Sequence, residues 1–162
     1  MTGNLEGRIK QLEARVQELA DQEAIRNLRY RYHEIINQGN YAAVPDLFTT
    51  DGMLDFDYLG GAKGTAELMV FFTQRLGNLF SFIKQFVHNH AVQVHGDTAT
   101  GFSFLEARTV VGGESYMVAA RYDDEYVREY GHWKFKKMTL MPYFTVPLRE
   151  GWAHPERLKM GK

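Results

Sequence analysis

Four consecutive stretches rich in β-branched and aromatic residues occupy the second half of the chain, and they constrain the fold more than any other feature. They run over about 85–94, 98–110, 115–129 and 132–146, and are separated by His95-Gly96-Asp97, Gly112-Gly113-Glu114 and Tyr130-Gly131. Such short turns predict an antiparallel meander. These strands exceed the usual length of about five or six residues, which predicts a strongly bent sheet. A bent sheet wrapped on helices encloses a hollow.

The N-terminal region carries an apolar stripe on an otherwise charged helix. Five aliphatic residues recur at alternating four- and three-residue steps, which is the spacing of a heptad seam. They are Leu5, Ile9, Leu12, Val16 and Leu19. A stripe of this kind needs an apolar partner. We expect it to lie on its own domain or against a neighbouring subunit, and we favour the subunit contact.

Further helices are predicted before the meander. Asp21 is expected to cap a second helix that ends near Asn37-Gln38-Gly39-Asn40 and has a polar edge at Arg26, Arg29, Arg31 and Glu34. A short helix over 41–48 and a half-buried strand over 53–59 should follow, with Asp55 and Asp57 on the solvated strand face. Thr65 is a predicted N-cap for a helix with Met69, Phe72, Leu76 and Phe80 on its apolar face.

Length and composition favour one domain with small neutral partners. A chain of 162 residues with 44% hydrophobic residues fits a single core. We divide it into a heptad helix over 1–20, an α+β core over 21–146 and a tail over 147–162. A net charge of −1 without a basic cluster argues against nucleic acid and membrane partners, and the absence of cysteine excludes thiol chemistry. Because the charged N-terminus lacks the apolar run of a signal peptide, we expect a cytoplasmic protein.

Several local strings resemble the SnoaL-like branch of the nuclear transport factor 2-like superfamily. They are Ala24-Ile25-Arg26-Asn27-Leu28 with Tyr32, Asp51-Gly52, Gly96-Asp97-Thr98-Ala99-Thr100-Gly101, and Tyr122-Asp123-Asp124-Glu125-Tyr126 running to Gly131-His132-Trp133-Lys134-Phe135. The chain resembles the bile-acid 7α-dehydratase type in particular, with scytalone dehydratase and hexachlorocyclohexane dehydrochlorinase further off. The resemblance implies a cone-shaped α+β fold in which a curved antiparallel sheet packs on about three helices.

The resemblance also implies a cofactor-free lyase, usually trimeric, although a dimer is an alternative. In these relatives a histidine oriented by an aspartate removes a proton while a tyrosine assists the leaving group. Tyr32 falls on the catalytic tyrosine, but the dyad positions fall on Asn37 and Gln85, whose amides cannot act as general bases. A further carboxylate falls on Ala107, and a first-strand tyrosine falls on Phe56.

The general base must therefore come from elsewhere. His88 adjoins the vacant position and a strand bulge would bring it into the pocket, whereas His90 is a weaker candidate. Glu106 would serve only if the strand parity were reversed, since alternation places it and Arg108 on the outer face. His33 and Glu34 are interpreted as surface or interface residues. A metal site at His88, His90 and His95 lacks a convincing further ligand, and we assign no metal or cofactor.

The resemblance, together with the 14% of aromatic residues, implies a lyase of the dehydratase or formaldehyde-eliminating type, or an isomerase, acting on a hydrophobic, aromatic or polycyclic hydroxylated molecule. The catalytic set is Tyr32, Asn37, Gln85, His88 and Glu106, and the substrate-binding set is Phe56, Tyr58, Ala107, Tyr116 and Tyr122. One alternative is a non-catalytic binding or assembly protein that has lost the dyad. Another is the small subunit of a ring-hydroxylating oxygenase.

Overall fold

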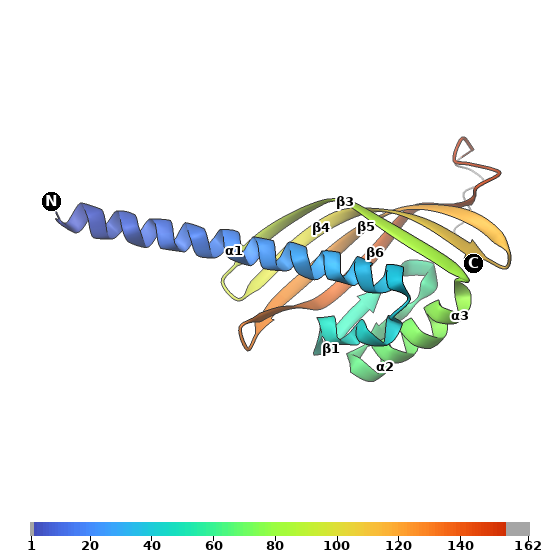
Figure 1. Ribbon diagram of the computed structural model, residues 1–162, viewed down its shortest axis with the longest axis horizontal. Coiled ribbons are helices and arrows are strands. Elements are labelled where there is room, and N and C mark those ends of the chain that lie inside the picture. The colour runs from blue at the N-terminus through green and yellow to red at the C-terminus, as the bar shows by residue number, and fades with distance from the viewer. Residues whose placement is uncertain (1, 155–162) are drawn as a thin grey trace.

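A curved six-stranded sheet wraps around a helical layer in the computed structural model, which describes residues 2–154 (Figure 1). The strand order is β2-β1-β6-β5-β4-β3. The strands are β1 (Phe48–Asp55), β2 (Gly61–Lys63), β3 (Phe82–His95), β4 (Thr98–Val111), β5 (Glu114–Glu129) and β6 (His132–Pro147). The helices are α1 (Thr2–Gln38), α2 (Gly64–Val70) and α3 (Gly77–Leu79), with a π-helical turn over Phe71–Leu76 and short 3-10 turns over Tyr41–Ala43, Pro45–Leu47 and Asp57–Leu59.

The predicted meander is confirmed in order, direction and turn positions. Strands β3 to β6 pair in succession, each antiparallel to the one before. In the β4–β5 turn both Gly112 (φ 59°) and Gly113 (φ 82°) have positive φ, as a two-residue type I′ turn requires. The sheet is not wholly antiparallel, however, because β1 pairs with β6 in parallel. Helices α2 and α3 and strands β2 to β5 separate these two strands in sequence, and a long connection of this kind permits parallel pairing.

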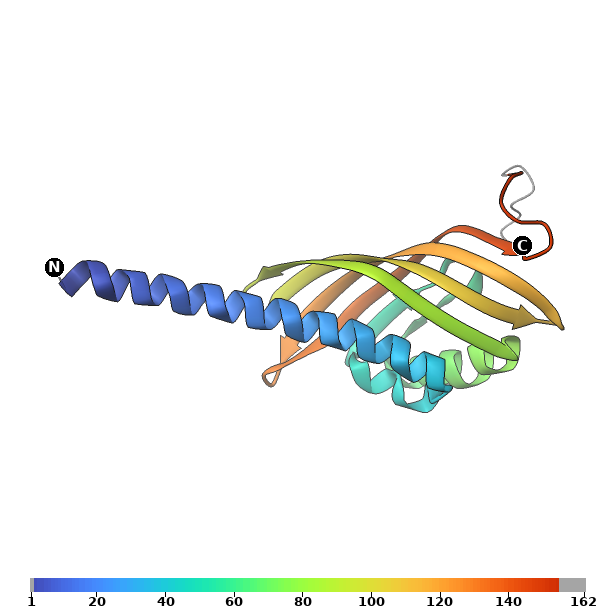
Figure 2. The ribbon, with the colours of Figure 1, turned by 45° about the horizontal axis from the view of Figure 1, so that its top comes forward.

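The first thirty-seven described residues form one uninterrupted helix, so the prediction of two helices divided at Asp21 is wrong. Asp21 is buried within α1 and accepts hydrogen bonds from Arg128 Nη1 at 2.7 Å and Trp133 Nε1 at 2.9 Å. Its carboxylate therefore joins α1 to β5 and β6 and does not cap a helix. Figure 2 shows α1 running past the end of the sheet, with only its C-terminal half over the strands.

Two local predictions are corrected around β1 and α2. The strand over 53–59 ends at Asp55, and Tyr58 lies in a 3-10 turn. Helix α2 begins at Gly64, so Thr65 is not its cap; Glu67 Oε2 accepts the backbone N–H of Lys63 at 2.8 Å instead. The carboxylate of an early helical residue satisfies a donor that the first turn leaves unpaired.

The core fills the space between the concave face of the sheet and the helices. It is unusually aromatic, and Phe72 and Phe135 are among its fully buried members. Their rings meet edge-on or tilted against Tyr32, Phe48 and Tyr126 at centroid distances of 5.2–6.5 Å. The C-terminal half of α1 is therefore held against the sheet by aromatic packing.

Replacing Asp21 tests the joint between α1 and the sheet. We expect Asp21→Ala to lower the free energy of unfolding by about 2–3 kcal/mol, because it leaves the Trp133 N–H without its partner. Glu18→Ala is the control, since the ion pair between Arg15 and Glu18 is exposed and its loss should leave stability nearly unchanged. Urea unfolding of the three proteins measures both effects, and equal stabilities would contradict the assignment.

Candidate active site

Three aromatic side chains form a buried triangle where the C-terminal half of α1 meets β5. Tyr32 and His33 come from α1 and Tyr122 comes from β5, and their exposed fractions are 0%, 4% and 0%. The ring centroids lie 5.1 Å apart for Tyr32 and His33, 6.1 Å for the two tyrosines, and 5.8 Å for His33 and Tyr122. Each ring meets its neighbours edge-on, which is a favoured geometry for aromatic contacts.

The interpretation of His33 as a surface residue is wrong. A step of about 100° separates His33 from Tyr32 on the helix, but Tyr32, His33, Ile35 and Ile36 are all buried. Helix α1 is covered here by β3 on one side and by the aromatic core on the other, so a wide arc of its surface lies inside. The periodicity of a helix gives the direction of a side chain but not how much of the helix is covered.

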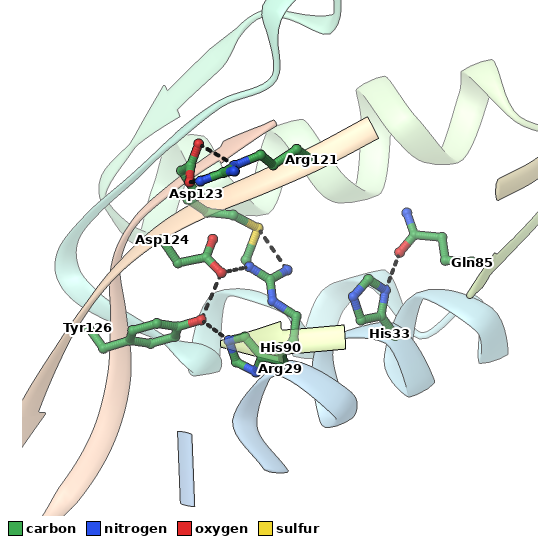
Figure 3. A network of polar contacts seen from close by, with 9 residues as sticks. Arg29, His33, Gln85, His90, Arg121, Asp123, Asp124 and Tyr126 are labelled. Carbon is green, nitrogen blue, oxygen red and sulfur yellow. Dashed lines mark hydrogen bonds and ion pairs between the residues drawn. The ribbon is translucent and has the colours of Figure 1, made fainter. Parts of the chain in front are cut away.

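Gln85 on β3 determines which nitrogen of His33 carries the proton. His33 Nδ1 lies 2.8 Å from Gln85 Oε1 (Figure 3). The amide oxygen can only accept, so Nδ1 donates and Nε2 holds a free lone pair. Asn37 fixes Gln85 in turn: its side chain donates to the Gln85 carbonyl at 2.9 Å and accepts the Gln85 N–H at 2.7 Å. The amides of Asn37 and Gln85 thus act on the backbone and on His33 respectively, and not as one pair.

Four buried polar atoms in this region make no hydrogen bond of ordinary geometry among the described residues, although the Tyr32 and Tyr122 hydroxyls lie near enough to shift each other's pKa. They are the hydroxyls of Tyr32, Tyr122 and Ser103 and Nε2 of His33. Ser103 lies directly opposite Tyr122 in the β4–β5 register. Burying a polar atom without a partner costs free energy, so such atoms are uncommon in folded proteins. A cluster of them has the character of a binding site for polar ligand atoms.

A buried ion pair lies beside the triangle. Arg29 on α1 contacts Asp124 on β5, both side chains are fully buried, and the guanidinium carbon lies 4.3 Å from the centre of the Tyr122 ring. Tyr126 donates to Asp124 Oδ2 at 2.7 Å, and His90 Nε2 lies 3.0 Å from the Tyr126 oxygen (Figure 3). The Tyr126 proton is already used, so His90 is the donor in that contact.

Burial and the charge of Arg29 set the protonation states in the triangle. Burial raises the pKa of Tyr122 to about 12 and raises that of Tyr32 well above its ordinary value, so both hydroxyls keep their protons near neutral pH. Burial, and next the Arg29 charge, lower the pKa of His33 to about 3. The triangle therefore offers two hydroxyl donors and one neutral imidazole acceptor.

The predicted site residues separate into three groups. Tyr32, Gln85 and Tyr122 come together in the interior, where Phe56 lies edge-on to Tyr122 at 5.9 Å and Ala107 is buried. The predicted substrate residues Tyr58 and Tyr116 instead line an open pocket of about 520 Å³. It also contains Thr109, Val118 and Thr145. Tyr32, His33 and Tyr122 are not among the residues that line this pocket, although Val118, Ala120 and Tyr122 share one face of β5.

The predicted bases His88 and Glu106 lie on the outer face of the sheet. Their side chains are 56% and 44% exposed, and His88 Nε2 is 3.8 Å from Glu106 Oε2. The bulge after Val87 does not turn His88 inward, and Glu106 has the outward parity expected from alternation. Neither residue faces the interior, which corrects their assignment as bases. Among residues 2–154, no three His, Asp or Glu side chains gather as metal ligands.

Sequence reasoning missed His33 as a polar site residue and placed Arg29 on a solvated edge. A signal for Arg29 was present, because it follows Ile25 by four residues and precedes Tyr32 by three, and so lies on the apolar stripe. An arginine on such a stripe has to find a buried partner. No local pattern names Asp124, which is 95 residues away.

A curved sheet closed around a helical layer, with polar groups converging inside the cone, is the architecture of nuclear transport factor 2-like domains. The chain belongs to the SnoaL-like domain family, whose profile matches residues 17–139. An uncharacterised protein of Mycobacterium bovis is 30% identical over 123 residues, which cover 74% of this chain and 83% of that protein, and counterparts in Mycobacterium tuberculosis match equally well.

Solved structures share the fold. A hexachlorocyclohexane dehydrochlorinase superposes with a TM-score of 0.78 at 21% identity, covering 82% of this chain and 92% of that one. A scytalone dehydratase-like protein from Novosphingobium aromaticivorans has a TM-score of 0.72 at 21% identity, with 80% and 88% coverage. A nuclear transport factor 2-like protein from the same organism covers 94% of this chain and 97% of its own at 25% identity, with a TM-score of 0.67. In the described part of the chain, no helix is long and apolar enough to span a membrane.

Tyrosine-to-phenylalanine substitutions test whether a buried hydroxyl stabilises the fold or is available to a ligand. We expect Tyr32→Phe and Tyr122→Phe to leave the free energy of unfolding unchanged or to raise it by up to about 1 kcal/mol, since each removes a buried hydroxyl that makes no hydrogen bond of ordinary geometry. Tyr126→Phe is the matched control and should lower it by about 1.5–3 kcal/mol, because its hydroxyl donates to a buried carboxylate. Denaturant unfolding compares the three, and a similar loss in all of them would contradict the assignment.

The buried neutral imidazole predicts a dependence of stability on pH. His33 has a pKa of about 3 when folded and an ordinary value of about 6.5 when unfolded. The unfolded chain binds its proton first, so stability is complete above pH 6.5 and falls as the pH drops toward 3. Between pH 7 and 5 we expect His33 to account for a loss of about 2 kcal/mol. Urea unfolding of the wild type and His33→Gln should show a smaller loss in the variant, and equal losses would contradict this prediction.

Proposed function

We propose that the protein is a cofactor-independent lyase acting on a hydrophobic, hydroxylated aromatic or polycyclic molecule. The observation that carries the proposal is the mutual packing of the His33, Tyr32 and Tyr122 rings, which buries Nε2 and two hydroxyls without a hydrogen bond of ordinary geometry. A β-elimination needs a base for a carbon-bound proton and a donor for the departing oxygen. The dehydrochlorinase and the scytalone dehydratase-like protein share the fold, which is consistent with elimination chemistry.

In the proposed reaction a substrate enters past Tyr58 and Tyr116 and places its hydroxylated end at the triangle. His33 Nε2 takes the proton from the carbon next to the one that bears the leaving group. The carbon–hydrogen electron pair forms the new double bond, the carbon–oxygen bond breaks, and Tyr32 protonates the leaving oxygen, which departs as water. The proton on His33 then returns to the Tyr32 oxygen.

Gln85 and Arg29 have positioning roles in this scheme. Gln85 accepts a hydrogen bond from His33 Nδ1–H and so leaves the lone pair on Nε2. The Gln85 amide orients the imidazole as a carboxylate would. Because the amide is uncharged, the imidazole is less basic than it would be beside a carboxylate. The Arg29 guanidinium lies over the Tyr122 ring and stabilises negative charge that develops on the phenolic oxygens.

The activity test uses hydroxylated aromatic and polycyclic compounds, with product mass identifying loss of water or of formaldehyde. We expect Tyr32→Phe to reduce turnover by about 100-fold or more, the contribution of a general acid, and His33→Gln to have a similar effect. Tyr130→Phe is the control, because Tyr130 is fully exposed. Turnover unaffected by either site substitution would remove the triangle from the mechanism.

A second candidate is a protein that binds such molecules without converting them. The lowered pKa of His33, about 3, favours it because a weakly basic imidazole accepts a hydrogen bond more readily than a carbon-bound proton. Calorimetric titration distinguishes the two functions. Binding weakened by Tyr32→Phe, together with no product from any ligand that binds, would support this candidate and exclude the lyase.

A further inference from the structure

The N-terminal half of α1 extends away from the domain and carries an uncovered apolar stripe. In Figures 1 and 2 this segment projects beyond the sheet. Its five apolar side chains are 46–64% exposed. They are Leu5, Ile9, Leu12, Val16 and Leu19. A continuous row of exposed aliphatic side chains on a helix marks a contact with another chain.

The stripe faces away from the protein's own domain. Farther along α1, the face that packs on the sheet is defined by Ile25, Arg29, Tyr32 and Ile36, which are all fully buried. At about 100° per residue, the stripe lies roughly 150° around the helix from that face. It is therefore not an extension of the domain core. A second helix can lie along it without meeting the sheet of the same subunit.

The residue types on the stripe favour a coiled coil of two parallel helices. Alternating steps of four and three place Ile9 and Val16 at a positions of the heptad and Leu5, Leu12 and Leu19 at d positions. β-Branched residues at a with leucine at d favour a parallel two-stranded coiled coil, whereas isoleucine at d favours three or four strands. The apolar seam ends after Leu19, because Glu23 and Arg26 occupy the next two positions.

The flanking charges favour the same arrangement. Arg8 is at a g position, and Glu13 is at the e position that a parallel partner brings beside it. Two-fold symmetry forms this pair of opposite charges twice. An antiparallel partner would instead bring Arg8 toward Arg15 and place acidic e positions together.

We propose that two copies of this chain associate through a parallel, in-register coiled coil over residues 5–19. The seam covers only about two heptads, which is short for an isolated pair of peptides. Here the helix is already nucleated, because residues 21–38 of the same α1 are packed on the sheet. The association does not depend on the proposed reaction.

A single cysteine tests register and direction, since the natural chain has none. Leu5→Cys should form a disulfide between two copies under mild oxidation, because like d positions face each other only in a parallel, in-register pair. Ala14→Cys, on the opposite side of the helix, is the control and should remain largely uncrosslinked. Crosslinking of Leu5→Cys with a second variant, Leu19→Cys, and not with itself, would show an antiparallel pair and overturn the proposal.

A charge exchange tests the flanking pair. We expect Arg8→Glu to raise the dissociation constant of the dimer by about fivefold or more at low salt, and Arg8→Glu with Glu13→Arg to restore it. Sedimentation equilibrium of the full chain gives the mass and the dissociation constant. A wild-type monomer, a trimer, or equal constants for the single and double variants would overturn the proposal, and circular dichroism confirms that the variants are folded.

Discussion

The buried ion pair between Arg29 and Asp124 is the contact around which the other polar side chains of the interior are arranged. It joins α1 to β5 with both side chains fully buried. Removing two charges from water is expensive, and a buried pair of this kind seldom stabilises a fold more than apolar residues would. Asp124 also accepts from Tyr126, but Arg29 Nε and Asp124 Oδ1 have no partner in the described structure. The interior is therefore more polar than folding alone requires.

That excess polarity accounts for the properties of the triangle. The Arg29 charge acts with burial to hold His33 neutral, and the Tyr122 ring lies directly beneath the guanidinium. Two protonated phenols and one unprotonated imidazole nitrogen are thus packed together in the core, out of contact with solvent. Burying polar groups in this way lowers the stability of the fold but fixes their protonation states. Functional sites commonly combine these two effects.

Helix α1 serves two purposes through two different faces. Its C-terminal half contributes Arg29, Tyr32 and His33 to the interior, and Asn37 aligns the β3 backbone that carries Gln85. Its N-terminal half presents aliphatic residues to the outside. A rigid helix connects them, so the proposed dimer would hold the two C-terminal halves of α1 at a fixed separation. The outer pocket, lined by Tyr58 and Tyr116, is built from other elements and remains accessible.

Local sequence determined the meander, its turns, its strand parity and the stripe on α1, because these features depend on residues a few positions apart. The outward positions of Glu106 and Arg108 followed from alternation alone. Tertiary structure decided the parallel pairing of β1, the burial of His33 and the partners of Arg29 and Asp21. Each of those depends on how far one element is covered by another that is distant in sequence, and no periodicity encodes that coverage.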